Sequence, residues 1–180
     1  IYDPVGDRML VFGGESSSST LDDLWSLSLG GAPAWTQLAP AGTLPSMRQG
    51  HRAIYDPLRD RMVVFGGYDG SDTMLNDVWS LSLTGIPTWT QLAPTGAPPS
   101  VRYLYGAIHD PMRDRMLIFG GGYWDDSVIY SDAWVLSLGE TPAWTQLSPT
   151  GTSPGPRYAH SAIYDPVRDQ MVVFAGMSTI

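Results

Sequence analysis

One phrase of eight residues constrains this chain more than any other feature. Residues 60–67 read Asp-Arg-Met-Val-Val-Phe-Gly-Gly, and the phrase recurs at 7–14, at 114–121 and, altered, at 169–176. A short apolar run followed by paired glycines is typical of a β-strand that stops abruptly. The Asp-Pro pairs that precede the four copies are 53, 54 and 55 residues apart. The chain is therefore predicted to be an array of repeats of about 50 residues.

Each repeat is predicted to form four antiparallel strands. In the second copy, Asp56-Pro57 begins the turn between the first two strands, because Asp accepts backbone hydrogen bonds and Pro fixes φ. The second strand is apolar on both faces and is ended by Gly66-Gly67, the third alternates, and the fourth is half polar like an exposed edge. Repeated four-stranded units of this kind make the blades of an all-β propeller. The predicted strands of this copy are 49–55, 61–65, 75–83 and 88–92.

The motifs around these strands resemble the kelch repeat, in the form common in bacterial extracellular proteins. They are Arg-x-x-His-Ser-Ala, Val-Val-Phe-Gly-Gly, Asn-Asp-Val-Trp and Trp-Thr-Gln-Leu. The resemblance covers the whole chain and implies a kelch-type β-propeller with an extracellular or periplasmic location. Three positions depart from the pattern: Tyr105 replaces the first-strand His, Gln170 replaces Arg, and Ala175 replaces the first glycine.

The repeats amount to about three and a half blades. We expect an incomplete first blade at 1–47, two blades at 48–101 and 102–156, and the first two strands of a further blade at 157–180. Propellers typically close with 4–8 blades. Closure is therefore expected either from flanking repeats of a longer propeller or from a second copy of the chain, which would make a homo-oligomer.

Tryptophan follows the same period. One Trp stands in each third strand and one in each fourth strand, and large rings at repeated positions are predicted to pack blade against blade. Trp124 alone lies outside this spacing, in the longest and least repetitive loop. The periodic residues are Trp25, Trp79 and Trp134, and Trp35, Trp89 and Trp144.

Composition excludes several classes of partner. The net charge is −8, and all ten basic residues are Arg. An acidic chain lacks the basic patch that binds nucleic acid or an anionic membrane. The chain has no Cys, and its apolar runs are shorter than the ~18 residues of a membrane span.

Blade topology sorts the loops between two rims. The first strand begins and the second strand ends on one rim, so we expect the loops after the double glycines and the long Pro/Gly loops (40–47, 94–101, 149–156) to share it. The kelch resemblance implies that this loop rim is the ligand face. The predicted rim residues are Glu15, Arg48, Tyr68, Arg102, Tyr103, Tyr123, Trp124, Arg157 and Tyr158.

The rim residues have competing interpretations. The aromatic rings are suited to stacking on a sugar or gripping a peptide, or else they cover strand ends. Binding is favoured for Trp124 because function concentrates in irregular loops, whereas both readings stay open for the tyrosines. The three Arg residues recur once per blade, which favours pairing with Asp or loop carbonyls over recognition of a ligand carboxylate.

Metal and cofactor sites are not predicted. His51 and His160 occupy one repeat position, but the third copy has Tyr105 there, so packed histidines are favoured over a shared metal. Asp pairs in the loops offer oxygen ligands for Ca²⁺, yet Asp beside Gly and Ser is ordinary turn chemistry. The pairs are Asp22/Asp23, Asp69/Asp72 and Asp125/Asp126.

No catalytic constellation is recognisable in the sequence. The two Glu residues, Glu15 and Glu140, are expected on opposite rims, which makes them a poor acid/base pair. The sequence therefore predicts a non-catalytic module that binds a protein or a glycan at its loop rim. Two alternatives remain: a carbohydrate-active kelch enzyme whose active site lies in other blades, and a purely structural or engineered self-assembling array.

Overall fold

The structure, a computed structural model, describes residues 1–178, which contain fifteen strands and no helix. The last two residues of the predicted fourth unit, 157–180, lie outside this range. The strands are β1 (Tyr2–Asp3), β2 (Arg8–Glu15), β3 (Thr20–Ser28), β4 (Trp35–Leu38), β5 (Ala41–Gly42), β6 (Arg52–Asp56), β7 (Arg61–Tyr68), β8 (Met74–Ser82), β9 (Thr88–Leu92), β10 (Gly106–Asp110), β11 (Arg115–Phe119), β12 (Ala133–Ser137), β13 (Trp144–Leu147), β14 (Ser161–Asp165) and β15 (Gln170–Phe174).

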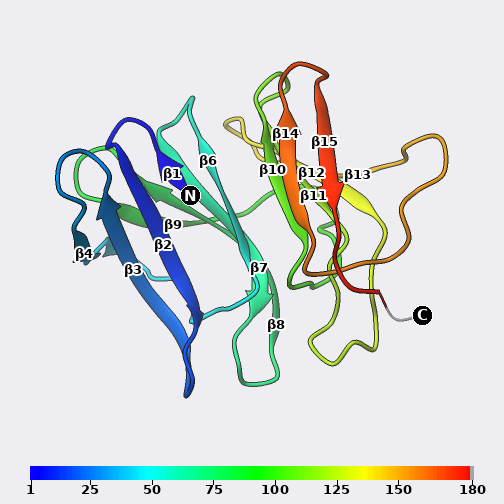
Figure 1. Cartoon of the computed structure of the whole chain (residues 1–180), viewed down its shortest axis with the longest axis horizontal. Helices are drawn as coiled ribbons and strands as arrows, with labels where there is room; N and C mark the ends of the chain where they lie inside the picture. Colours follow the sequence, from blue (N-terminus) through cyan, green and yellow to red (C-terminus); the bar gives the residue numbers. More distant parts are fainter. Residues whose placement is uncertain (179–180) are drawn as a thin grey trace.

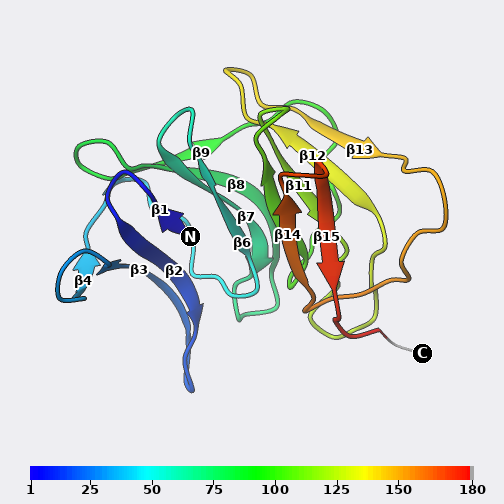
Figure 2. The same ribbon diagram turned by 45° about the horizontal axis from the view of Figure 1, so that its top comes forward.

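These strands form successive antiparallel blades. The sheets have the orders β1-β2-β3-β4, β6-β7-β8-β9 with β5 added outside β9, β10-β11-β12-β13, and β14-β15. In Figure 1 the blades follow one another from the blue β2 and β3 on the left to the red β15 on the right. Figure 2 shows the same succession from a second direction. The innermost strands β6, β10 and β14 are neighbours in space.

Each hairpin between the first two strands of a blade is a turn organised by Asp. In the second blade the Asp56 carboxylate accepts a hydrogen bond from the Leu58 amide at 3.1 Å and pairs with Arg61 at 2.8 Å. Asp60 ends the turn with a φ of 44°, a left-handed conformation that Asp tolerates better than most residues. The turn prediction is thus confirmed, and its residues carry the ion pairs described below.

The double glycine does not end the second strand in the first two blades, contrary to the prediction. β7 continues through Gly66 and Gly67 to Tyr68, with a shift in its register against β8 between Phe65 and Gly67. β2 has the same shift. The glycines therefore form a β-bulge, which turns the strand toward the rim. In the third blade β11 ends at Phe119, as predicted.

The long loops do not lie wholly at the rim, which corrects a second prediction. β5 pairs in parallel with the first residues of β9, Thr88 and Trp89, along the outer side of the second blade. Thr95 makes a similar parallel bridge to Ala143 in the third blade. The fourth strand is therefore not a free edge in these blades, because the loop from the preceding blade covers part of it.

The core lies between the blades, as the periodic tryptophans predicted. One buried cluster joins the first blade to the second, and another joins the second to the third. Across these interfaces the Phe12 and Trp89 ring centroids lie 4.8 Å apart, and so do those of Phe65 and Trp144. At the two ends of the array, Trp35 is 53% exposed and Phe174 is 76% exposed.

Ion pairs also join the blades at the rim that carries the hairpin turns. The Arg59 guanidinium contacts the Asp114 carboxylate of the next blade at 2.7 Å, and Arg113 contacts Asp169 at 2.6 Å. Pairs this exposed contribute about 1 kcal/mol or less to stability. They connect the neighbouring hairpin turns of successive units.

Candidate functional site

The loops that follow the double glycines gather on one side of the array. They appear at the lower side of Figure 1, opposite the hairpin turns. Their bases are tied to the start of the first strand by antiparallel bridges, Gln49 to Tyr68 and Tyr103 to Gly122. This confirms that the two segments share the loop rim, and it places the predicted aromatic residues on one surface.

Tyr68 and Trp124 stack on each other although they belong to different blades. Their ring centroids lie 5.7 Å apart with an angle of 19° between the ring planes. Tyr68 ends β7, and its hydroxyl accepts a hydrogen bond from the Asp72 amide at 3.2 Å, so the ring is held at both ends. Trp124 is 42% exposed. The pair is a rigid aromatic surface open to solvent.

A second pair of rings continues this surface. The rings of Tyr103 and Tyr158 are nearly parallel, at 17°, with centroids 6.4 Å apart. The Tyr103 hydroxyl donates to the Trp124 carbonyl at 3.3 Å, and the Tyr158 hydroxyl donates to Asp126 at 3.2 Å. Partial burial and the nearby Asp126 charge raise the pKa of both phenols. Both tyrosines donate hydrogen bonds, and they link the third blade to the fourth unit.

The other predicted rim residues on the loops have distinct places. Tyr123 is partly buried, and its amide donates to the Val128 carbonyl at 2.8 Å, which closes the loop that carries Trp124. Glu15 is exposed at the end of β2 and lines a cavity of about 380 Å³, together with residues 16–20, Gln49, Tyr68 and Gly70. Glu15 and Tyr68 therefore meet at one cavity, whereas Tyr123 supports its loop.

Arg48 and Arg102 do not line the rim surface, which corrects the prediction for these two residues. Both side chains are fully buried. Arg48 donates to both Asp77 oxygens at 2.8 and 2.9 Å and to the Gly66 carbonyl at 3.1 Å. Arg102 makes the matching bonds to Asp132 and Gly120. The alternative of pairing with Asp and loop carbonyls is the one that these contacts confirm.

Arg157 is the third member of this set, and it is partly exposed. It donates to the carbonyls of Gly155 and Ala175, both at 3.1 Å. No carboxylate pairs with it among residues 1–178, because the fourth unit has no third strand there to supply an Asp. Arg157 therefore keeps a place at the edge of the rim, beside Tyr158.

The histidines that share the first-strand position are packed between blades. His51 lies edge-on to Phe12 and His160 to Phe119, with centroids 5.5 and 5.6 Å apart. Burial, with help from nearby Arg48, lowers the pKa of His51 to about 4. Tyr105 fills the same position in the third blade and donates to the Phe65 carbonyl at 2.6 Å. The interpretation as packed residues agrees with this placement.

The Asp-rich loops are organised as turns. The Asp69 carboxylate accepts hydrogen bonds from the Ser71 amide and hydroxyl and from the Thr73 amide, at 2.8 to 3.0 Å. Asp125 accepts from the Ser127 amide at 3.0 Å. Asp69 and Asp125 are therefore engaged by their own loops, as in ordinary Asp turns.

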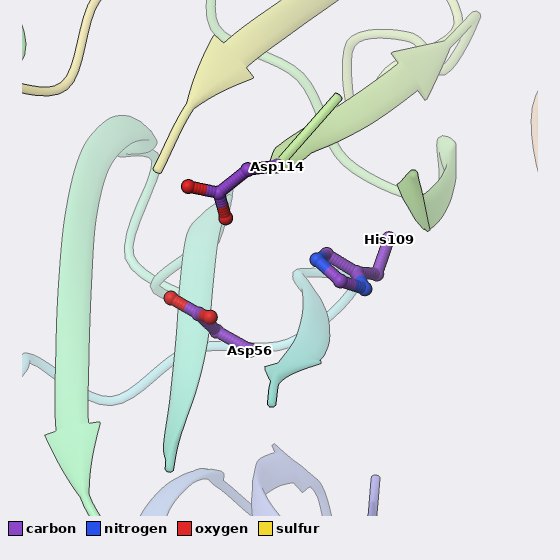
Figure 3. Close-up of side chains that lie close together, drawn as sticks. All are labelled: Asp56, His109 and Asp114. Atoms are coloured by element: carbon purple, nitrogen blue, oxygen red, sulfur yellow. The ribbon is translucent and has the colours of Figure 1, made fainter. Parts of the chain in front are cut away.

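One group of possible metal ligands lies on the opposite rim. Figure 3 shows Asp56, His109 and Asp114 facing one another, with ligand atoms all within 4.8 Å. Arg59 donates to both carboxylates, at 3.1 Å to Asp56 and at 2.7 Å to Asp114, and Arg61 adds a further bond to Asp56. Burial lowers the pKa of His109. The two arginines neutralise the charges of the Asp56 and Asp114 carboxylates. Because Arg59 pairs with carboxylates of both the second and the third blade, the cluster links these two blades.

Sequence reasoning missed three contributors to the rim. Asp126 accepts the Tyr158 hydroxyl, Gln49 holds Tyr68 in place, and Gly70 lets two loops approach. A Cβ at Gly70 would collide with the Thr20 side chain. The place of Gln49 on the rim was recognisable from the sequence, because it directly follows Arg48 at the start of the first strand. The contacts of Gly70 and Asp126 join different loops, and such contacts leave no periodic signal in the sequence.

Comparisons with known proteins agree with the repeat architecture. The family model described as the KLHDC2/KLHL20/DRC7 Kelch-repeats domain matches residues 4–180. Adagio-like protein 3 of Oryza sativa subsp. japonica is 35% identical over 162 residues, which cover 87% of this chain and 24% of that protein. Adagio protein 3 of Arabidopsis thaliana is 32% identical over 179 residues, covering 97% of this chain and 28% of that protein.

A third relative has a different overall description. The dynein alpha chain of the flagellar outer arm of Chlamydomonas reinhardtii is 31% identical over 188 residues, covering 96% of this chain but 4% of that protein. The chain thus spans less than a third of the length of each of these relatives.

The described residues include no helix of the length and apolarity that crossing a membrane requires.

Proposed function

The chain belongs to the kelch-repeat family, and from that premise we propose that it is a non-catalytic protein-interaction module that holds its partner at the loop rim. Kelch-repeat relatives support the general role of a β-propeller interaction module. The assignment of the rim rests on one observation, the exposed stack of Tyr68 on Trp124 across two blades. Exposed aromatic residues on a rigid scaffold are the side chains that most often anchor protein interfaces.

The experiment is a pull-down with the immobilised chain, followed by mass spectrometry. The double variant Tyr68→Ala/Trp124→Ala removes the stack from the rim surface. Leu58→Ser/Met112→Ser is the matched control, because these residues are 70% and 73% exposed on the opposite rim. We expect the first variant to lose its partners and the control to keep them, with similar melting temperatures for both. Retention of all partners by the first variant would show that the rim assignment is wrong.

Glycan binding is the finer alternative predicted from the same rings. Its support is limited to the stacking surface, since parallel aromatic faces also suit a sugar ring. A glycan array with the wild-type chain and the Tyr68→Ala/Trp124→Ala variant distinguishes the two classes. Sugar binding that depends on these rings, without any protein partner, would replace the present proposal.

Location and assembly complete the proposal. An extracellular or periplasmic location was predicted from a bacterial type of repeat, whereas the relatives named above come from eukaryotic organisms. Fractionation of source cells, with detection by an antibody to the chain, tests the predicted location directly. Closure by flanking repeats or by a second copy is proposed from the exposed Trp35 and Phe174 at the two ends of the array.

A further inference from the structure

The rim cavity beside Tyr68 is built from equivalent positions of two adjacent blades. Glu15 directly follows the double glycine of the first blade, and Tyr68 directly follows that of the second. Both residues end strands and are fixed by ladder pairs, Glu15 with Thr20 and Tyr68 with Met74. The cavity, of about 380 Å³, therefore presents one carboxylate and one aromatic ring from rigid elements.

The lining of this cavity has hydrogen-bond acceptors but no cation. Glu15, serine hydroxyls and the Gln49 amide supply the polar atoms. Within residues 1–178 the Glu15 carboxylate has no ion pair or hydrogen bond, whereas Asp69 nearby is satisfied by its own turn. Glu15 is thus a free negative charge held beside the edge of an aromatic stack.

The three loops that follow the double glycines carry charge of one sign. The segments 15–23, 68–77 and 122–132 contain nine acidic residues and no Lys, Arg or His. Arg48 and Arg102, beneath these loops, are buried and already paired with Asp77 and Asp132. Arg157 is partly exposed, at the edge of the rim beside Tyr158. A negatively charged partner segment would be repelled by this rim, and a positively charged one would be attracted.

The molecule itself contains an example of the recognition that this surface permits. Beneath the same rim the Arg102 guanidinium carbon lies 4.4 Å from the centre of the Tyr130 ring while its nitrogens bind the Asp132 carboxylate. A guanidinium held by an aromatic face and a carboxylate together is a stable arrangement. Tyr68 and Glu15 offer the same two groups, but here no arginine of the described chain occupies them.

We propose that this cavity binds an arginine side chain of an extended, positively charged partner segment. The proposal rests on the proposed function and specifies its partner. The guanidinium enters between the loops of the first two blades, pairs with Glu15 and lies against Tyr68. The neighbouring part of the segment crosses the Tyr68–Trp124 stack toward Asp126, where a second positive charge finds a carboxylate.

The test uses short fluorescein-labelled Gly/Ser peptides that carry arginine, glutamine or glutamate at the same two positions. Fluorescence polarisation should give at least about tenfold tighter binding of the arginine peptide than of the glutamine peptide. This difference should shrink as salt rises from about 0.05 to about 0.3 M. Equal binding of the arginine and glutamate peptides, or no binding of the arginine peptide, overturns the proposal.

Two isosteric substitutions that each remove one negative charge distinguish binding at this cavity from a general effect of acidity. Glu15→Gln removes the free carboxylate, and Glu140→Gln makes the same change on the opposite rim, where Glu140 is also exposed. We expect Glu15→Gln to weaken the arginine peptide at least about fivefold and Glu140→Gln to leave it unchanged. Equal effects of the two variants would contradict the cavity site. If partners found by pull-down need Trp124 but not Glu15, this inference fails while the proposed function stands.

Discussion

The Arg48 guanidinium and the Asp77 carboxylate, 29 residues apart, face each other through two hydrogen bonds of 2.8 and 2.9 Å. Arg48 is fully buried, and the Asp77 side chain is 23% exposed. Although burial opposes ionisation, the bonds from Arg48 hold the pKa of Asp77 below its usual range. The pair ties the start of the first strand of a blade to the start of its third strand, beneath the rim.

Asp77→Ala should therefore destabilise the chain by about 3–5 kcal/mol, because it leaves a buried guanidinium without a counter-charge. Asp23→Ala is the matched control, because Asp23 holds the same repeat position. Asp23 accepts a hydrogen bond from the Trp25 indole at 2.6 Å, as Asp77 does from Trp79. Among residues 1–178, however, Asp23 has no Arg partner. Its cost should be about 1 kcal/mol. Urea unfolding measures both, and equal costs would show that the buried ion pair is not the cause.

Stability should fall in mild acid because His51 is packed between two blades. Its folded-state pKa of about 4 lies below its ordinary value of 6.5. The unfolded chain therefore takes up the proton first, so this stabilisation is complete above pH 6.5 and is lost as pH falls toward 4, by roughly 3 kcal/mol. The lowered pKa values of His109 and His160 act in the same direction.

His51→Tyr should reduce this pH dependence, because Tyr105 shows that a phenol fits the same repeat position. The free energy of unfolding in urea, measured at pH 7.5 and 4.5, should differ less for the variant than for the wild type. His51→Asn repeats the test with a smaller side chain. An unchanged pH dependence in both variants would mean that His51 does not cause it.

Ala175 stands in the fourth copy where the other copies have glycine, and this predicts opposite effects on stability for two substitutions. Ala175 has a φ of 59°, the same left-handed value as Gly66 at the matching position. Ala175→Gly should stabilise by up to about 1 kcal/mol, because it relieves left-handed strain at some cost in chain entropy. Gly66→Ala should destabilise by at least about 1–2 kcal/mol, since its Cβ would lie 3.2 Å from the Arg102 carbonyl oxygen. Melting temperatures that move the same way for both would contradict this.

The exposed ends of the array predict self-association of the 180-residue chain. Phe174 matches Phe12 and Phe65, which pack on a Trp of the next blade, and Trp35 matches those Trp residues. Sedimentation velocity at micromolar concentration should detect a dimer or larger species. Phe174→Ser or Trp35→Ser should shift it toward monomer, whereas Val167→Ser, exposed in a hairpin turn, should not. A wild-type monomer would exclude closure by a second copy.

The repeat made the blades predictable from sequence. The strands follow from apolar runs and turn residues that recur in register, and the rim follows from strand direction alone. In the first two blades the double glycine was misread as a stop, because a bulge and a strand end share the same residues. Only the pairing of Phe65 and Gly67 with β8 distinguishes them.

The site was predictable in part. Strand topology placed Tyr68, Tyr103 and Tyr158 on one rim, but the stacking of Tyr68 on Trp124 depends on how two loops of different blades meet. Pairing of Arg48 with an Asp or a loop carbonyl was predicted, but Arg48 was also placed on the rim surface, where it does not lie. Its partner Asp77 could not be named because it lies 29 residues along the chain. The same spacing recurs between Arg102 and Asp132, and that repetition was the available signal.

Photo-crosslinking at two single positions tests the rim account most directly. A benzophenone amino acid replaces Trp124 in one variant and Met112, on the opposite rim, in the other, and each is irradiated in a source-cell extract. The account predicts a discrete protein adduct from position 124 and none from position 112. An adduct formed only from position 112, or in equal yield from both, would contradict the claim that the rim carrying Tyr68 and Trp124 is the binding face.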